Sequence, residues 1–308
     1  MSAALTLLFP VVRGLIAATL ILLIGTPMAG AIARRHGPAL GTPSRPIIEG
    51  WLQRLPGLLA WCLLTCSMLR GALQLLSFAE PGEPISADLM RAVLMEGSWA
   101  LAWMAQSVAA FLLLAISWRW RGQPRRLLPA TLALLLIAVT AEGGLGHGAA
   151  DLWPGILGWA VHALHLIGSG LWLGTLAILA LAVFPSLEGD DALREVLAVL
   201  VAFSRQARLG VFLVITTGLM ATFRYSAGRV LELPSEAWGR LLLIKLVLVG
   251  GVMLLGWWNW RRGTPALVAM EAGATSRLRL AITTELMLGG LILLLTAWLV
   301  GSPLPAAR

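Results

Sequence analysis

Eight stretches of the chain are apolar over the length that a helix needs to cross a lipid bilayer. The hydrocarbon core is about 30 Å thick, which corresponds to about 20 helical residues. Lipid offers no hydrogen-bond partner to an open strand edge, so a spanning segment of this kind is a helix. We therefore expect an all-α polytopic membrane protein in which residues 1–308 form a single transmembrane domain. The eight predicted transmembrane helices cover approximately residues 4–25, 56–78, 98–118, 127–142, 157–184, 205–225, 238–260 and 281–300.

Charged residues are scarce in this chain. They make up 12% of the sequence, against about 25% in an average soluble domain, and 58% of the residues are hydrophobic. A soluble domain of this length cannot cover so much apolar surface. The net charge of +8 comes almost wholly from arginines between the apolar runs, and the only lysine, Lys245, lies inside one. Charge between spans sets orientation in the membrane, and we expect no nucleic-acid partner.

The connections between the predicted helices alternate in charge. The odd connections are rich in arginine, as in the third, "RWRGQPRR". The second connection is mainly acidic, and the fourth has Glu142 and Asp151 but no arginine. Because cytoplasmic connections carry the excess of Lys and Arg, we expect the odd connections to be cytoplasmic and both termini to face outward. The fourth connection, which contains His147, then lies outside as well.

Two pairs of segments suggest an internal duplication. "RGLIAATLILLIGT" from Arg13 and "HALHLIGSGLWLGT" from His162 share spaced leucines and end in Gly-Thr, at an offset of 149 residues. "WRWRGQP" after the third predicted span is similar to "WNWRRGTP" after the seventh. These pairs favour a repeat of four plus four helices in parallel orientation. Hydrophobic helices also resemble one another by chance, so both interpretations stay open.

Three of the four histidines lie in the segment "GHGAADLWPGILGWAVHALHLIG", which covers residues 146–168. His162 and His165 are three residues apart and therefore share a helix face, while His147 lies on the adjoining outer connection. A membrane imidazole is costly unless it makes a hydrogen bond or binds a metal, and neutral histidine is the commonest metal ligand. The alternative is that each imidazole bonds a neighbouring helix. The clustering favours a metal site formed by His147, His162 and His165.

Sulfur-containing residues favour copper over zinc as the metal, because soft thioether and thiolate ligands select Cu(I). Four methionines fall in the outer loop or in the outer halves of spans, and two cysteines four residues apart share one face of the second span. Both residue types also serve as ordinary packing residues. The candidates for a copper pathway are Met90, Met95, Met104, Met220, Cys62 and Cys66.

Arg13, Arg70 and Lys245 each lie about 10–13 Å below the outer ends of their predicted spans, at 1.5 Å per residue. Charges at that depth usually face the bundle interior, although a long side chain can also extend to the headgroups. We expect a buried charged layer in which acidic residues of the outer side neutralise these three, with Glu142, Glu96 and Glu80 as candidates. At the inner side, we expect Glu285 to meet Asn259.

Several ordered motifs resemble the copper resistance protein D family of inner-membrane copper-handling proteins. They are Gly146-His147, Leu164-His165 followed by Trp172-Leu173-Gly174, and the Phe-Ser-Arg entry at residue 203. Further similar segments are "WGRLLLIKLVLVGGVMLLGWWNW" and the closing helix with an early Glu, and the similarity covers residues 130–300. The resemblance implies eight transmembrane helices in the bacterial inner (plasma) membrane, a copper ion as substrate, and a periplasmic copper carrier of the CopC type as partner.

These observations lead us to expect a copper transport protein, which takes copper from the periplasmic side and passes it inward, rather than an enzyme. The sequence has no P-loop that would mark an ATP-driven pump. A haem-binding electron-transfer protein is a second possibility, but it needs axial histidines on facing helices. A third is a copper sensor or assembly subunit that binds copper without transporting it.

Overall fold

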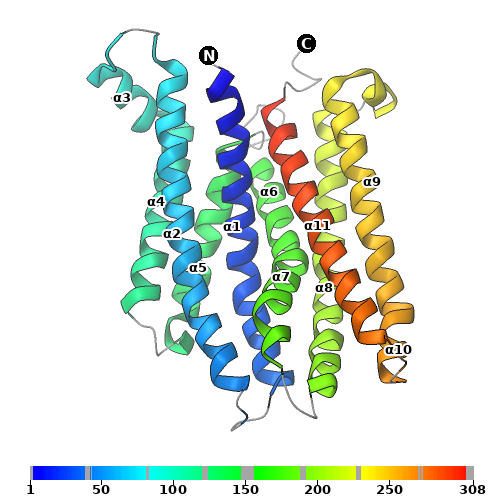
Figure 1. Ribbon diagram of the computed structural model, residues 1–308. Coiled ribbons are helices and arrows are strands. Elements are labelled where there is room, and N and C mark those ends of the chain that lie inside the picture. The colour runs from blue at the N-terminus through cyan, green and yellow to red at the C-terminus, as the bar shows by residue number, and fades with distance from the viewer. Residues whose placement is uncertain are drawn as a thin grey trace.

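The computed structural model describes residues 3–38, 42, 44–80, 83–119, 124–146, 156–187, 192–226, 230–269, 271 and 273–302. These residues form helices and no strand, which confirms the predicted all-α class. Long helices run side by side, and the start of the first and the end of the last lie at the same end of the bundle (Figure 1). The main helices are α1 (Ala3–His36), α2 (Ser44–Phe78), α4 (Gly97–Arg119), α5 (Pro124–Gly144), α6 (Leu157–Ser169), α8 (Ala192–Tyr225), α9 (Ala237–Trp258) and α11 (Ala274–Gly301).

Seven helical segments of the described residues are long and apolar enough to cross a membrane, so the chain is a multi-pass membrane protein. The predicted count of eight is not confirmed, because the apolar part of α5, Leu128–Gly144, is shorter than the other seven. The helix itself begins at Pro124, and two arginines follow in its first turn. The seven segments are Leu7–His36, Ser44–Phe78, Gly97–Arg119, Leu157–Ser186, Leu193–Tyr225, Ala237–Val268 and Ala274–Gly301.

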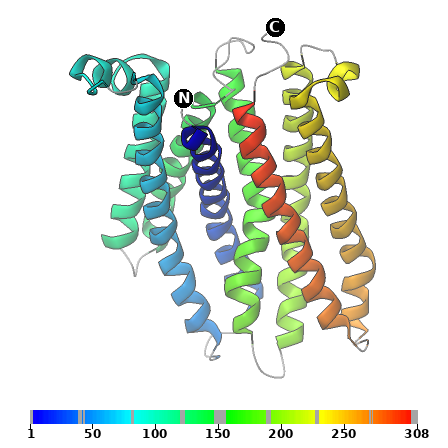
Figure 2. The ribbon, with the colours of Figure 1, turned by 45° about the horizontal axis from the view of Figure 1, so that its top comes forward.

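Several helices extend beyond the apolar runs that predicted them. α1, α2 and α8 have 34, 35 and 34 residues, respectively. An apolar run marks only the hydrocarbon layer, whereas backbone hydrogen bonds continue the helix into the polar headgroup region. A short helix that the sequence analysis did not predict, α3 (Ala87–Leu94), lies beside the end of the bundle (Figure 2). Ser86 caps it by accepting a hydrogen bond from the Leu89 amide at 3.1 Å.

The segment that carries the membrane histidines is not a regular α-helix over its whole length. After α6 it passes through a π-helical turn, η2 (Gly170–Gly174), the short α7 (Thr175–Ile178), a second π-helical turn, η3 (Leu179–Val183), and η4 (Phe184–Ser186). Such π-helical turns are frequent at functional sites. The α9 helix ends in a similar turn, η6 (Asn259–Gly263), before α10 (Thr264–Val268); η5 (Val230–Ser235) precedes α9.

The α1 helix packs directly on the backbone of η2. A Cβ atom on Gly174 would overlap the carbonyl oxygen of Ile21, and one on Gly25 would overlap the backbone of Gly174. Only glycine permits this approach, because any side chain would separate the two helices. On its other side, α6 approaches α8 in the same way, since a Cβ on Gly168 would lie 2.8 Å from the carbonyl oxygen of Gly210. The histidine-bearing helix is therefore held between α1 and α8.

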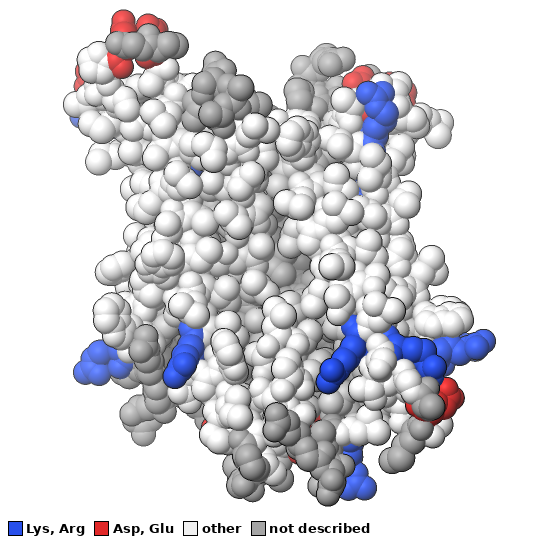
Figure 3. Space-filling view, viewed as in Figure 1, with Lys and Arg blue, Asp and Glu red and all other residues white. Residues whose placement is uncertain are grey.

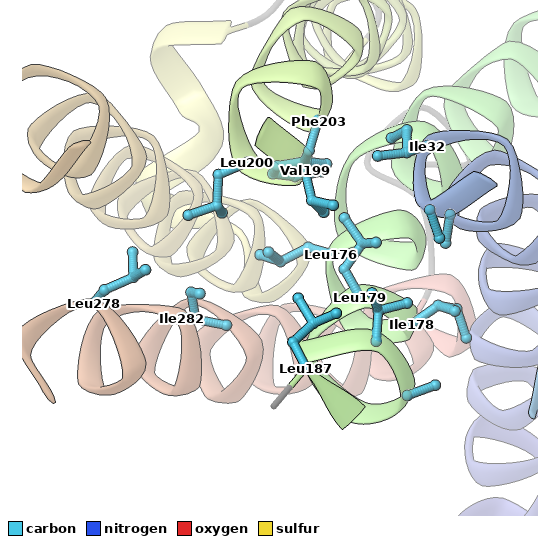
Figure 4. Packing of buried hydrophobic residues seen from close by; sticks show 14 of the residues in the cluster. Ile32, Leu176, Ile178, Leu179, Leu187, Val199, Leu200, Phe203, Leu278 and Ile282 are labelled. Atoms are coloured by element: carbon cyan, nitrogen blue, oxygen red, sulfur yellow. The ribbon is translucent and has the colours of Figure 1, made fainter. Parts of the chain in front are cut away.

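Two buried apolar clusters fill the bundle. One joins α1, α7, η3, α8 and α11, and within it the side chain of Leu176 lies between those of Val199 on α8 and Ile282 on α11 (Figure 4). The other joins α1, α2, α4, α5 and α6 around Ile16, Leu20 and Leu63, which are fully buried. Together, the two clusters hold α6 in place between the neighbouring helices.

The two ends of the bundle differ in the charged side chains that they carry. On the face shown in Figure 3, basic side chains gather near the lower end, and a broad zone with almost no visible charge lies above them. Acidic side chains are prominent at the upper end, where α3 lies, and one group of basic atoms lies there as well, at the upper right. The chain termini lie at this upper end, which agrees with the alternation of charge in the sequence.

Candidate metal centre

His162 and His165 lie in α6, one to two turns from the amino-terminal end of the helix at Leu157. Both side chains are half-buried. The spacing of three residues places them on one face of the helix, and they are close enough for the charge of one to act on the other. The structure thus brings together the two histidines that the sequence predicted as membrane ligands.

Thr217 of α8 orients the ring of His165. The Nδ1 atom of His165 and the Thr217 hydroxyl oxygen are 2.9 Å apart. The Thr217 hydroxyl donates its single proton to the Leu213 carbonyl at 2.5 Å, so it accepts the hydrogen bond from His165. Nδ1 then carries the ring proton, and Nε2 retains the lone pair that a metal requires. Thr217 is buried, with 4% of its surface exposed, so water does not compete for this bond.

His162 presents a nitrogen without a protein partner. Among the described residues, its Nε2 atom is buried and makes no hydrogen bond. A buried polar atom without a partner is rare in folded proteins and costs about 1–3 kcal/mol. Glu142, Arg70 and Lys245 lie close enough for their charges to act on this ring. Among the described residues, the atom therefore has no partner and is available to a ligand.

A buried ion pair lies beside the histidines. The guanidinium of Arg70 in α2 donates to the carboxylate of Glu142 in α5 at 2.7 Å. Gln106 of α4 donates to the same carboxylate oxygen at 2.8 Å. Arg70 is 1% exposed and Gln106 is fully buried. Three helices therefore meet at one carboxylate inside the bundle.

Arg70 also fixes the end of α5. Its second terminal nitrogen donates to the Leu145 carbonyl at 2.6 Å. A cation is favourable at the carboxyl end of a helix, where the last carbonyls have no helical partner. Leu145 is two residues before His147 in the sequence, so Arg70 holds the backbone close to the segment that contains His147. His147 itself lies outside the described residues.

Two glycines at the end of α5 allow α6 to come close. A Cβ on Gly143 would lie 2.8 Å from the Cα of Trp159, and a Cβ on Gly144 would lie 2.5 Å from the indole ring of the same residue. Larger residues here would push α6 away from Glu142. The sequence Glu-Gly-Gly thus places a carboxylate next to His162.

The other predicted members of the charged layer have different partners. Arg13 donates to the Val300 carbonyl near the end of α11 at 3.3 Å, so its partner is a carbonyl rather than an acid. Lys245 of α9 is half-buried near His165, and its amine makes no hydrogen bond or ion pair with the residues that the structure describes. Glu96 pairs with Arg91 at the surface at 3.3 Å; Glu80 is exposed.

The sulfur-containing candidates lie at several depths. Met90 and Met95 are 43% and 72% exposed on and beside α3, at the acidic end of the bundle. Met104 is half-buried in α4, and Met220 is 42% exposed on α8. The Cys62 and Cys66 side chains interact within α2. Thr19 of α1 lies 3.5 Å from the Cys62 sulfur.

Across the described ranges, no group of three or more His, Cys, Asp or Glu side chains lies together in a way that could hold a metal ion. The two α6 histidines provide two ligands, and a third has to come from elsewhere. The predicted three-histidine site therefore stays a prediction that depends on His147.

Sequence reasoning missed two polar residues of this region, Thr217 and Gln106. Both lie within long apolar runs, where a single hydroxyl or amide resembles a neutral packing residue. The sequence points to them only indirectly, because a polar side chain within an apolar run needs a hydrogen-bond partner when it is buried. The predicted contact between Glu285 and Asn259 is confirmed, because the Asn259 amide donates to the Glu285 carboxylate at 2.7 Å.

Comparisons with known proteins agree with the resemblance found in the motifs. The family model described as copper resistance protein D-like, N-terminal domain, matches residues 3–159, and the model described as copper resistance protein D matches residues 197–299. The first match includes the amino-terminal region, which lies outside the residues 130–300 covered by the motifs.

One curated relative is a copper resistance protein D from Pseudomonas syringae pv. tomato. The chain is 28% identical to it over 173 residues, which are 54% of this chain and 54% of the relative. The chain thus spans about half the length of this relative. No solved structure matches the chain.

Proposed function

Because the chain belongs to the copper resistance protein D family, we propose that it binds copper at its outer face and moves the ion inward across the membrane. A role in copper handling follows from the family. Transport, its direction and the absence of an enzymatic reaction are parts of our proposal.

The pair of half-buried imidazoles in α6 is the observation that carries this proposal. His162 has an unpartnered Nε2 atom, and the bond to Thr217 leaves Nε2 of His165 with its lone pair free. Imidazole suits copper well. A hydrogen bond to the other ring nitrogen is the usual way in which a protein orients a metal-binding histidine.

In our proposal, His147 captures copper and transfers it to His162 and His165 by exchange of ligands. Met90 and Met95, which are exposed at the acidic end, would collect the ion first. Deeper in the bundle, the thiols of Cys62 and Cys66 would receive Cu(I), because thiolates are softer ligands than imidazole. The positive charges of Arg70 and Lys245 lie near His162 and would repel a copper ion that moves past it. The region around the Arg70–Glu142 pair would therefore act as a barrier to free passage of the ion.

We propose the bacterial inner membrane as the location, with both termini in the periplasm. The position of α3 and the acidic side chains at one end, and of most basic ones at the other, supports this orientation. The α5 helix has 21 residues and is therefore about 31 Å long, enough to cross the hydrocarbon layer as the eighth span. A periplasmic copper carrier of the CopC type would deliver the ion.

A repeat of four plus four helices accounts for the central helix contact. Gly25 and Gly174 are 149 residues apart in the sequence, which is the offset of the two similar segments. They contact each other where α1 meets η2, as equivalent residues do at a twofold axis. The pairing of α5 with α6 also has a counterpart in the pairing of α11 with α1.

Copper titration of the purified protein in lipid nanodiscs tests the proposed site. We expect His147→Ala, His162→Ala and His165→Ala each to weaken copper binding by more than tenfold. His36→Ala is the matched control, because His36 is exposed at the other end of the bundle and should bind like the parent. If all of the first three variants bind copper like the parent, the site lies elsewhere.

Flux measurements in proteoliposomes test transport separately from binding. The parent should carry copper into vesicles, and the three histidine variants should not. Copper binding without flux in the parent would show a sensor or assembly subunit instead. An intense haem absorption band in the purified protein would contradict the proposal in favour of electron transfer.

A further inference from the structure

A large hollow in the described part of the molecule lies away from the histidines. It is a groove of about 920 Å³ between α1, the segment from η2 to η4, and α11. Small residues form much of its wall, among them Ala18, Ala177, Ala180 and Gly290. Because these side chains are small, a gap remains between α1, the segment from η2 to η4, and α11 at the surface of the bundle.

The groove opens toward the lipid. Leu181 and Met287, which belong to its lining, are 73% and 72% exposed. They lie within the membrane-crossing segments Leu157–Ser186 and Ala274–Gly301, so the surroundings that reach them are hydrocarbon rather than water. An open apolar groove in this position has the size and polarity to accept an acyl chain.

The basic end of the groove is polar. Arg279 and Thr283 of α11 line it there, beside Phe184 and Pro185. Arg279 is exposed and makes no ion pair with the described residues, whereas its neighbour Arg277 pairs with Glu271 at 3.2 Å. An unneutralised guanidinium at the level of the headgroups attracts a phosphate, which it can bind with two parallel hydrogen bonds.

The length of the groove matches one leaflet. Its lining on α11 extends from Arg279 to Leu293, which are 14 residues apart and therefore about 21 Å apart along the helix. Half of a bilayer of about 40–45 Å, headgroups included, is also about 21 Å. A phospholipid with its phosphate at Arg279 would place its acyl chain end near Leu293.

We propose that this groove binds one anionic phospholipid from the leaflet at the basic end of the bundle, with the phosphate on Arg279 and an acyl chain along Ala18, Ala177 and Gly290. The lipid would hold α1 and α11 against the histidine-bearing helix. Assigning that leaflet to the cytoplasmic side rests on the orientation proposed above; the binding site itself does not.

Native mass spectrometry of the full chain, titrated with phosphatidylglycerol or phosphatidylcholine, tests the site. We expect the parent to retain one phosphatidylglycerol in preference to phosphatidylcholine. Gly290→Leu fills the groove, and since no atom lies within 4 Å of its Cβ position, the helix packing should persist. This variant should lower occupancy at least tenfold. Gly250→Leu is the matched control on α9, where the position is equally open and lies outside the groove.

Arg279→Gln tests the headgroup contact, with Arg277→Gln as its control. We expect Arg279→Gln to abolish the preference for phosphatidylglycerol and Arg277→Gln to retain it. Arg279 is exposed, so this comparison remains decisive even if Gly290→Leu fails to fold.

Equal binding of both lipids by the parent would overturn the preference for an anionic headgroup, and unchanged occupancy in Gly290→Leu would overturn the groove. Copper titration of the same variants separates this proposal from the proposed function. Loss of lipid with unchanged copper affinity would support the groove alone, and the histidine variants should retain the lipid.

Discussion

The Thr217 hydroxyl accepts a hydrogen bond from Nδ1 of His165, and the two atoms are 2.9 Å apart across the interface of α6 and α8. This bond determines which nitrogen of His165 is free, and it depends on a residue that does not itself face the outer surface. Several expectations follow from this and the neighbouring contacts.

Thr217→Val removes the acceptor while keeping the shape of the side chain. We expect copper affinity to fall by about 10–100-fold, which is typical for loss of a partner of a metal-binding histidine. Thr217→Ser should restore most of it. Thr216→Val is the control, because the Thr216 hydroxyl is exposed and bonds only the Phe212 carbonyl of its own helix. Equal affinity of Thr217→Val and Thr216→Val, by the same titration, would exclude this role.

Arg70→Leu leaves the carboxylate of Glu142 buried without its cation. Breaking a buried pair on one side costs about 3–5 kcal/mol, so the variant should unfold at a clearly lower temperature in a thermal melt. The double variant Arg70→Leu/Glu142→Leu should regain much of that loss. Arg91→Leu breaks the exposed pair with Glu96 and should change stability by less than about 1 kcal/mol. A double variant no more stable than Arg70→Leu would contradict the pairing.

The orientation can be tested by labelling introduced cysteines in a Cys62→Ala/Cys66→Ala background. Glu83 is exposed near α3, and Arg277 is exposed near the start of α11. An impermeant maleimide should label Glu83→Cys in intact spheroplasts and Arg277→Cys only after lysis, since basic connections face the cytoplasm. The reverse pattern would place the histidines at the cytoplasmic side.

Gly174→Ala inserts a methyl group where α1 touches η2. Because the new carbon would overlap the Ile21 carbonyl, the helices must separate, and overpacking of this kind costs about 1–3 kcal/mol or more. The thermal midpoint should fall. Gly250→Ala, at an open position of α9, should leave it unchanged or raise it. Equal thermal midpoints for Gly174→Ala and Gly250→Ala would mean that moving α1 away from η2 costs no stability.

Much of the fold could be predicted because apolar length and arginine distribution act locally. The runs that contain Ile16, Leu63 and Leu166 each indicate a helix without reference to the others. The hydrogen bond between Asn259 and Glu285 could also be predicted, since both lie at the inner ends of neighbouring spans. The span ends were less predictable, because hydropathy does not report where backbone hydrogen bonds stop.

The site was less predictable because it depends on contacts between helices. Nothing in the sequence shows that Arg13 bonds the Val300 carbonyl, 287 residues away, rather than an acid. The role of Thr217 requires the relative rotation of α6 and α8. The π-helical turn η2 lies where Gly170 and Gly174 meet α1, a packing partner more than 140 residues away in the chain.

The contact between Gly25 and Gly174 limits how the bundle can move. Backbone touches backbone there, so α1 and the histidine-bearing helix cannot slide past each other without overlap of main-chain atoms. The movement that remains is a rotation about this point, with the helices on either side swinging in opposite directions. A change from outward to inward access would therefore resemble a rocker on a central pivot, with the glycine pair as the part that stays still.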